Sequence, residues 1–338
     1  MAFTTINKSS DYFVTNLWTG NDTAQTITGI PFAPDFVWIK NRSAAESHTL
    51  VNTVIGANNF LKSNAASANN TNSEFLKSFT SDGYTLGNAD EVNNGSNNIV
   101  GWNWKANGQG SSNTDGSINT TYTSANTTSG FSIVQYTGTG ANATVGHGLG
   151  ISPKMIILKQ TNTSKDWMIY HKYTNPNGTG SQYYLHLNSS DGKASNATMW
   201  QNTDPTSSLF SLGSSSNVNG SSDTYIAYCF AEVQGYSKIS SYVGNGNVDG
   251  SFIHTGFKPA YVIAKRTDGA SNWNQFDNKR FGFNVKNPLL YPNLTNLEAD
   301  DVFIDLLSNG FKWRTTNGDI NASGGSYIYM AFAEAPLV

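Results

Sequence analysis

The feature that most constrains the fold of this chain is an aromatic strand that occurs three times in register. Each copy of the strand is preceded, at the same distance, by an aliphatic residue followed by asparagine. The strands begin at Ile99, Tyr225 and Tyr327, and the pairs begin at Val92, Val218 and Ile320, so that 99−92, 225−218 and 327−320 are equal. Similarity at a fixed spacing marks a repeat architecture, so the pattern predicts one module present three times. Repetition favours a scaffold that binds or assembles over an enzyme.

A second strand is predicted in each copy by a proline, an apolar run and a lysine. Proline has no N–H to give to a central ladder and therefore suits the residue just before a strand. The runs are apolar nearly throughout and rich in β-branched and aromatic residues, as expected of strands covered on both faces. The prolines are Pro34, Pro153 and Pro259, and the lysines that follow at one common distance are Lys40, Lys159 and Lys265. Further along, the second and third copies have tryptophans, Trp167 and Trp273, where the first has His48.

Alternating aromatic residues give the repeated strand one buried face. Trp102 and Trp104 alternate in the first copy, and Tyr228 and Phe230 alternate in the second. We therefore predict an all-β fold of three tandem antiparallel β-sandwich modules of about 100 residues each, with little helix. A short helix is predicted over 294–307, where an apolar face follows a capping asparagine. The predicted domains are sandwiches at 1–106, 130–234 and 235–338, with a flexible linker rich in Ser, Thr, Asn and Gly at 107–129.

Composition limits the classes of partner. Charged residues make up only 13% of the chain, and a polar but weakly charged surface suits a protein outside a cell or on a particle. The net charge of −3 leaves no basic stripe, which argues against nucleic acid as a partner. No segment reaches the roughly 20 apolar residues of a membrane span, and the first residues lack the apolar core of a signal peptide. The single cysteine, Cys229, lies in an alternating aromatic strand and is predicted to be a buried, inert thiol.

Catalytic and metal-binding patterns are weak. The five histidines lack the spacing of a metal site. The glycine-rich run 146–150 precedes a strand instead of opening a helix, and the carboxylates near Asp300 suit a solvated helix face better than a glycosidase pair. We therefore predict no enzymatic activity, no cofactor and no metal. One question stays open: 245–250 has the oxygen spacing of a calcium loop but no glutamate at the twelfth position, so it is either a calcium site or an Asn/Gly turn.

Ligand binding is the better-supported activity. Sugars are held by exposed aromatic rings together with Asn, Asp and Gln on loops, and Asn-rich loops on rigid sandwiches are a common way to present such contacts. Aromatic residues without a counterpart in the other copies are the better candidates, because the repeated ones are expected to form the core. The candidate ligand-binding residues are Trp200, Tyr183, Tyr184 and Tyr291, together with His48, where the first copy departs from the tryptophan of the other two.

Longer stretches of the chain carry a resemblance to a known family. They are residues 1–6, 34–43, 76–84 and 102–106 in the first copy and 130–140 and 148–154 in the second. In these stretches the chain resembles a family of tailed-phage virion structural proteins, tail-fibre-like and of the marine phage type, with a repeated module. The resemblance covers nearly the whole chain, and it implies a place on the virion more than an activity.

The expected function is that of a phage virion structural protein, a tail fibre or receptor-binding (adhesin) subunit that contacts the host surface. The alternative is a capsid fibre, decoration or tail-assembly protein that binds only other virion proteins. Expected partners are other virion proteins and a host-surface glycan or protein, with no nucleic acid and no membrane insertion; a homotrimer is expected by analogy with phage fibres. The expected location is the virion, after synthesis in the host cytoplasm. Function is expected where the copies disagree, at the linker, at His48 and at the turn near Gly213.

Overall fold

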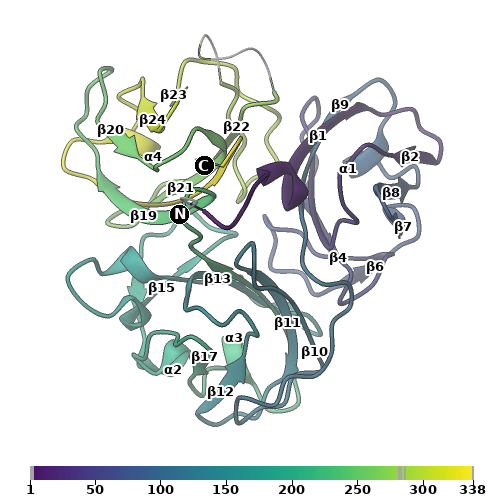
Figure 1. Cartoon of the computed structure of the whole chain (residues 1–338), viewed down its shortest axis with the longest axis vertical. Helices are drawn as coiled ribbons and strands as arrows, with labels where there is room; N and C mark the ends of the chain where they lie inside the picture. The colour runs from purple at the N-terminus through teal and green to yellow at the C-terminus, as the bar shows by residue number, and fades with distance from the viewer. Residues whose placement is uncertain (1–3, 281–283, 285–286, 337–338) are drawn as a thin grey trace.

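A computed structural model describes residues 4–280, 284 and 287–336, and it is all-β, as the sequence predicts (Figure 1). The strands form multiple antiparallel sheets, and the few helices are one turn long. In the part of the chain that is described, every helix is too short and too polar to cross a membrane. The strands fall into three groups, which we name units 1, 2 and 3, and these surround a common centre in Figure 1.

The elements of the three units follow one another along the chain. Unit 1 contains η1 (Ser9–Asp11), β1 (Phe13–Thr19), β2 (Gln25–Ile27), β3 (Phe36–Asn41), β4 (Thr49–Asn52), β5 (Asn59–Phe60), β6 (Asn70–Thr71), β7 (Leu76–Thr80), β8 (Gly83–Leu86), α1 (Asp90–Asn93) and β9 (Asn98–Trp104). Unit 2 contains β10 (Tyr122–Asn126), β11 (Phe131–Thr137), β12 (Ala143–Gly146), β13 (Pro153–Gln160), β14 (Met168–His171), η2 (Lys172–Thr174), η3 (Gly180–Gln182), β15 (Tyr183–His186), β16 (Ala194–Ser195), α2 (Ala197–Trp200), β17 (Leu209–Leu212), α3 (Ser216–Asn219) and β18 (Thr224–Ala231). Unit 3 contains β19 (Ser237–Val243), β20 (Phe252–His254), β21 (Pro259–Arg266), β22 (Trp273–Asp277), β23 (Ile304–Leu307), β24 (Gly310–Trp313), α4 (Gly318–Asn321) and β25 (Ser326–Ala333).

One strand order occurs in the inner sheet of every unit. The orders are β1-β9-β3-β4 in unit 1, β11-β18-β13-β14 within the longer sheet of unit 2, and β19-β25-β21-β22 in unit 3. The repeated aromatic strands are β9, β18 and β25, second in each order. Outer sheets β2-β8-β7, β12-β17 and β20-β24-β23 accompany them. We call residues equivalent when they lie at the same distance from the three prolines, or from the three aromatic strands, of the repeat, or when they pair with equivalent residues of those strands.

Each unit has an apolar core of its own, and a further core joins all three units. The inner sheets face this shared core, and one aromatic ring from each repeated strand lies at its centre. Trp104, Phe230 and Phe332 occupy equivalent positions, with ring centroids 5.9 to 6.3 Å apart in all three pairs. The strands are apolar on both faces because one face packs on the unit's own outer sheet and the other on the neighbouring units.

The repeated asparagine ties the two ends of each unit together. Its amide donates to the carbonyl oxygen six residues earlier (219−213 in unit 2). Its oxygen accepts from the N–H of the residue that follows a short aromatic-x-Gly sequence near the start of each copy, which ends at Gly20, Gly138 or Gly244. In unit 2, Asn219 contacts Gly213 O at 3.1 Å and Thr139 N at 2.8 Å. Asn93 and Asn321 make the same pair of bonds in units 1 and 3. All three asparagines are fully buried, so their hydrogen bonds satisfy groups that water cannot reach.

Two segments differ from the sequence-based expectations. The helix predicted over 294–307 is wrong, because Ile304–Leu307 forms β23, paired with β24, and alternation of buried Ile304 and Leu306 has prevailed over the helical periodicity. The segment 107–129 contains β10, which pairs with β11 along its length. Composition alone hid this strand, since its small polar residues are typical of linkers. The predicted domain boundaries stay predictions. The shared core contains residues of 1–106, 130–234 and 235–338, and Tyr122 of the predicted linker packs against it.

Candidate functional site

The units are joined in a closed ring by one backbone hydrogen bond that occurs at every junction. The acceptor is the carbonyl oxygen two residues after the repeated lysine, and the donor lies in the preceding unit. Asn69 N donates to Thr161 O at 2.8 Å, Lys193 N donates to Thr267 O at 2.8 Å, and Glu298 N donates to Arg42 O at 3.0 Å. The third bond joins unit 3 back to unit 1. A single chain therefore adopts a pseudo-threefold arrangement.

The three repeated lysines hold backbone carbonyls at these junctions. Each ammonium group donates to the carbonyl of the next residue and to a second carbonyl. For Lys159 and Lys265 the second acceptor belongs to the preceding unit, Ala66 O at 3.1 Å and Ser190 O at 3.2 Å. Lys40 uses Ala44 O, within its own unit, at 3.1 Å. Burial lowers the pKa of each lysine to about 8, because the charged form loses hydration that the carbonyls only partly replace.

His48 does at its junction what tryptophan does at the other two. Trp167 Nε1 donates to Lys62 O at 2.9 Å, and Trp273 Nε1 donates to His186 O at 2.8 Å. His48 Nε2 reaches the carbonyl of Tyr291 at 3.1 Å. Trp38 Nε1 donates to His48 Nδ1 at 2.9 Å, which leaves the proton on Nε2. The ring is fully buried and burial holds its pKa well below 6.5, so His48 is a neutral junction residue.

A second set of buried polar residues lies where the last strand of each inner sheet ends. Asn52, His171 and Asp277 are equivalent (52−34, 171−153 and 277−259 are equal) and pair with equivalent residues across each sheet. Each accepts an N–H from the turn that follows and contacts the next unit around the ring. The contacts are Asn52 Nδ2 to Tyr228 Oη at 2.8 Å, His171 Nε2 to Tyr329 O at 3.3 Å, and Trp102 Nε1 to Asp277 Oδ2 at 3.0 Å. Their common offset from the prolines would have revealed this set in the sequence.

His171 is expected to make stability depend on pH. Burial lowers its pKa to about 3, from 6.5 in the unfolded chain. Below pH 6.5 the His171 side chain binds a proton in the unfolded chain but stays neutral in the folded protein. The contribution of His171 to the free energy of unfolding is therefore complete above pH 6.5. It falls by about 1.4 kcal/mol per pH unit as the pH decreases toward 3. His171→Asn, which places the residue of the equivalent position 52, should reduce this slope. Urea unfolding at pH 7, 6 and 5 measures how the free energy of unfolding depends on pH in both proteins. An unchanged slope in the variant would contradict the role of His171. Some dependence on pH should remain in the variant, because His48 is present in both proteins and acts in the same direction.

The structure separates the predicted ligand-binding residues. Trp200 is 2% exposed and packs on Tyr170 at 6.1 Å between ring centroids, so its faces are not available to a ligand. Tyr291 and His48 meet at the junction of units 3 and 1, and Tyr184 packs against the core of unit 2. Tyr183 is the candidate that lines a groove. An aromatic residue unique to one copy can fill space unique to that copy, as Trp200 in α2 does.

The groove beside Tyr183 lies on unit 2 and has a volume of 410 Å³. Exposed polar residues border it, and the ammonium of Lys193 lies 4.6 Å from the centre of the Tyr183 ring. A ring and amide groups around an open groove can bind a polyhydroxylated ligand through stacking and hydrogen bonds. The amide residues of the groove were not predicted, because their only signal in the sequence is their nearness to Tyr183 along the chain. The residues that line the groove are Gln182, Tyr183, Ser195, Asn196, Ala197 and Asn202.

The possible calcium loop has internal partners for its oxygens. Asn245 Oδ1 accepts from Asn247 N at 3.0 Å, and Asn247 Oδ1 accepts from Asp249 N at 2.9 Å. The Asp249 carboxylate pairs with Lys312 at 2.5 Å. Across the described ranges no three His, Cys, Asp or Glu side chains gather as metal ligands. Cys229 is fully buried, as predicted, and burial raises the pKa of its thiol to about 12.

Comparison with known proteins identifies a family. A family model described as a domain of unknown function (DUF7483) matches residues 8–336. The match extends over nearly the whole chain and all three units, and the chain therefore belongs to this family. No curated protein and no solved structure matches it.

Proposed function

We propose that the chain is a phage virion structural protein, a tail fibre or receptor-binding subunit that contacts the host surface. The observation that carries the proposal is the groove at Tyr183 on a closed ring of β-sandwich units. All three junctions repeat one backbone hydrogen bond and share an apolar core, and a preorganised scaffold presents contact residues at little entropic cost. The groove has the ring and the amide groups that suit a host-surface glycan. The resemblance to tail-fibre-like virion proteins supports the location.

Competition for adsorption tests this function. Purified protein should bind the bacterium that the phage infects and slow adsorption of the phage. Tyr183→Ala should weaken cell binding by about threefold to tenfold, because it removes the ring on which a sugar would stack, while Tyr183→Phe should keep it. Saturable binding is measured with labelled protein and intact cells. Protein that binds no cells at any concentration would overturn the receptor-binding role.

A second candidate is supported by the pseudo-threefold ring itself. One chain of this shape fits a threefold position on a capsid or tail, where a decoration or assembly protein binds only other virion proteins. Antibodies against the chain, applied to intact particles in electron microscopy, distinguish the two. Labelling of tail tips together with cell binding supports the receptor-binding subunit. Labelling of the head, with saturable binding to empty capsids and none to cells, supports the decoration protein.

A further inference from the structure

β1 leaves one edge of the inner sheet of unit 1 unpaired. β9 pairs with one side of β1, and within the described ranges no strand pairs with the other side of β1. Lys105 N donates to Tyr12 O at 3.0 Å, which directs the backbone groups of the even-numbered β1 residues toward β9. The backbone N–H and C=O groups of Phe13, Thr15 and Leu17 therefore face outward. An open edge of this kind is a template for another strand.

In unit 2 the chain itself covers the equivalent edge. β11 is the counterpart of β1, and β10 pairs with it in the antiparallel direction. Thr121 N, just before β10, donates to Gln135 O at 2.8 Å. Gln135 is equivalent to Leu17, because the two pair with the equivalent residues Ile226 and Val100 of the aromatic strands. The occupant of this slot is an extended segment of small polar residues.

Two equivalent glycines show that the space filled by β10 is open beside β1. Gly148 and Gly29 lie at the same distance before their prolines (153−148 and 34−29) and both have a positive φ. A Cβ at Gly148 would lie 3.1 Å from the side chains of Thr123 and Ala125 in β10. A Cβ at Gly29 would meet nothing within 4 Å. Both glycines adopt the left-handed conformation, and the covering strand is found beside Gly148 but not beside Gly29.

The third edge, that of β19, is protected. Glu232 Oε2 accepts from Ile239 N at 3.2 Å, and Ile239 is equivalent to Thr15. η2 of unit 2 also lies against β19. A charged side chain at the edge and a covering element are both common means of preventing strand addition. Among the described residues no hydrogen bond of this kind reaches the outward backbone groups of Thr15 or Leu17.

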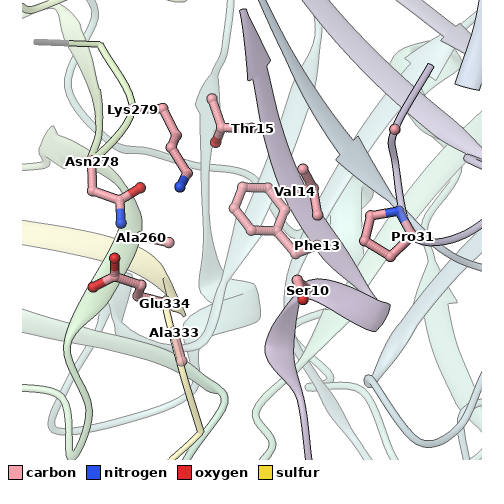
Figure 2. A pocket seen from close by; sticks show the side chains of 11 residues that line it. Ser10, Phe13, Val14, Thr15, Pro31, Ala260, Asn278, Lys279, Ala333 and Glu334 are labelled. Carbon is pink, nitrogen blue, oxygen red and sulfur yellow. The ribbon is translucent and has the colours of Figure 1, made fainter. Parts of the chain in front are cut away.

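A pocket of 190 Å³ lies against the open edge, between units 1 and 3 (Figure 2). Two polar atoms in its lining, Thr15 Oγ1 and Asn278 Oδ1, are buried and have no hydrogen-bond partner in the described part of the chain. Thr15 is 7% exposed, and both of its equivalents, Ile133 and Ile239, are isoleucine. Buried polar groups are normally paired, so these two atoms mark a part of the pocket wall where hydrogen-bond donors are lacking. The apolar part of the lining is Phe13, Val14, Pro31, Ala260 and Ala333.

The charge at the rim favours an acidic group on the ligand. Figure 2 shows Lys279 and Glu334 on the unit 3 side of the pocket. Glu334 pairs with Lys258 at 2.5 Å. Lys279 is exposed and has no carboxylate partner among the described residues. The pocket is smaller than the roughly 300 Å³ at which ligand pockets usually begin, so it suits one side chain better than a whole molecule.

We propose that the outer edge of β1, together with this pocket, binds an extended segment of a partner polypeptide as an added antiparallel strand. The backbone of the segment pairs with Thr15 and Leu17, one apolar side chain enters the pocket, and an acidic residue lies beside Lys279. Main-chain bonds supply affinity and the pocket supplies specificity in this mode of recognition. The inference rests on the proposed function only in taking the partner to be another virion protein.

A library of displayed random twelve-residue peptides, selected on the full chain, tests this site. A synthetic peptide with the sequence of residues 119–127 serves as a defined probe. Thr15→Pro removes the outward N–H without touching the β1–β9 ladder, because proline is tolerated at an outward-facing edge position. Selected peptides should bind Thr15→Pro at least about tenfold more weakly, as measured by fluorescence anisotropy, while Thr15→Ser should bind as the unaltered chain does.

Ala260→Lys tests the pocket separately. It places the residue of the equivalent position 154, where Lys154 pairs with Glu232 at 3.1 Å, so the variant should fold and fill the pocket. Selected peptides should lose affinity for it and should be rich in Asp or Glu. A library that yields only peptides insensitive to both variants, or none, overturns the proposal, and so does self-association of the chain that Thr15→Pro abolishes. Neither result bears on cell binding through Tyr183, so the two proposals fail independently.

Discussion

Replacing Trp104 by alanine is expected to lower the free energy of unfolding by about 3–5 kcal/mol and to weaken all three units together. The indole is 1% exposed. Its ring lies 6.3 Å from Phe230 of unit 2 and 5.9 Å from Phe332 of unit 3, centroid to centroid. The cavity would therefore open in the core that the three units share. Urea unfolding measures the loss, and hydrogen exchange measures where it falls, with faster exchange expected in β9, β18 and β25.

Trp313→Ala is the matched control. Trp313 is also fully buried, but it packs in the core of unit 3 alone. A similar loss of stability is expected, because the same side chain is removed, yet the increase in hydrogen exchange should be greatest in unit 3. If Trp104→Ala increased exchange in unit 1 only, the shared core would not couple the units.

The all-β class was predictable because alternating aromatic residues and apolar runs that begin after a proline are both typical of β-strands. The closing of the ring was not predictable in the same way. A strand such as β3, apolar at nearly every position, indicates that both faces are covered but not what covers them. Two of the three lysines carry part of the missing information, since Lys159 and Lys265 are buried against carbonyl oxygens that the preceding unit supplies, Ala66 O and Ser190 O.

The candidate site was predicted only in part, for a related reason. Divergence between copies predicts ligand contact, and one of the residues that it selects, Tyr183, lines a groove. The same criterion selected His48 and Trp200, where divergence reflects packing. His48 replaces tryptophan but keeps the hydrogen bond to the neighbouring unit, and Trp200 packs in the core of unit 2. β10 was not predicted because it covers the edge of β11 through backbone hydrogen bonds, which do not require particular side chains.

Arg280→Met is expected to lower the free energy of unfolding by about 3–5 kcal/mol, because it leaves the buried carboxylate of Asp277 without its cation. The Arg280 side chain is fully buried. Its guanidinium donates to Asp277 at 2.6 Å and to Glu298 at 2.9 Å, and Glu298 in turn accepts two bonds from Arg42 of unit 1. The network thus fixes the junction that closes the ring. Unfolding in urea, followed by tryptophan fluorescence, measures the loss.

A second arginine substitution, at a partly exposed ion pair, distinguishes loss of this buried network from loss of a surface charge. Arg266→Met removes an arginine from a partly exposed pair with Asp268, for which less than about 1 kcal/mol is expected. Adding Asp277→Asn to Arg280→Met should restore part of the loss, since it removes one stranded carboxylate and places the residue of the equivalent position 52. The two arginine substitutions could lower the free energy of unfolding equally, or the double variant could be less stable than Arg280→Met alone. Either result would mean that the shared apolar core, and not the charged network, holds the junction of units 3 and 1.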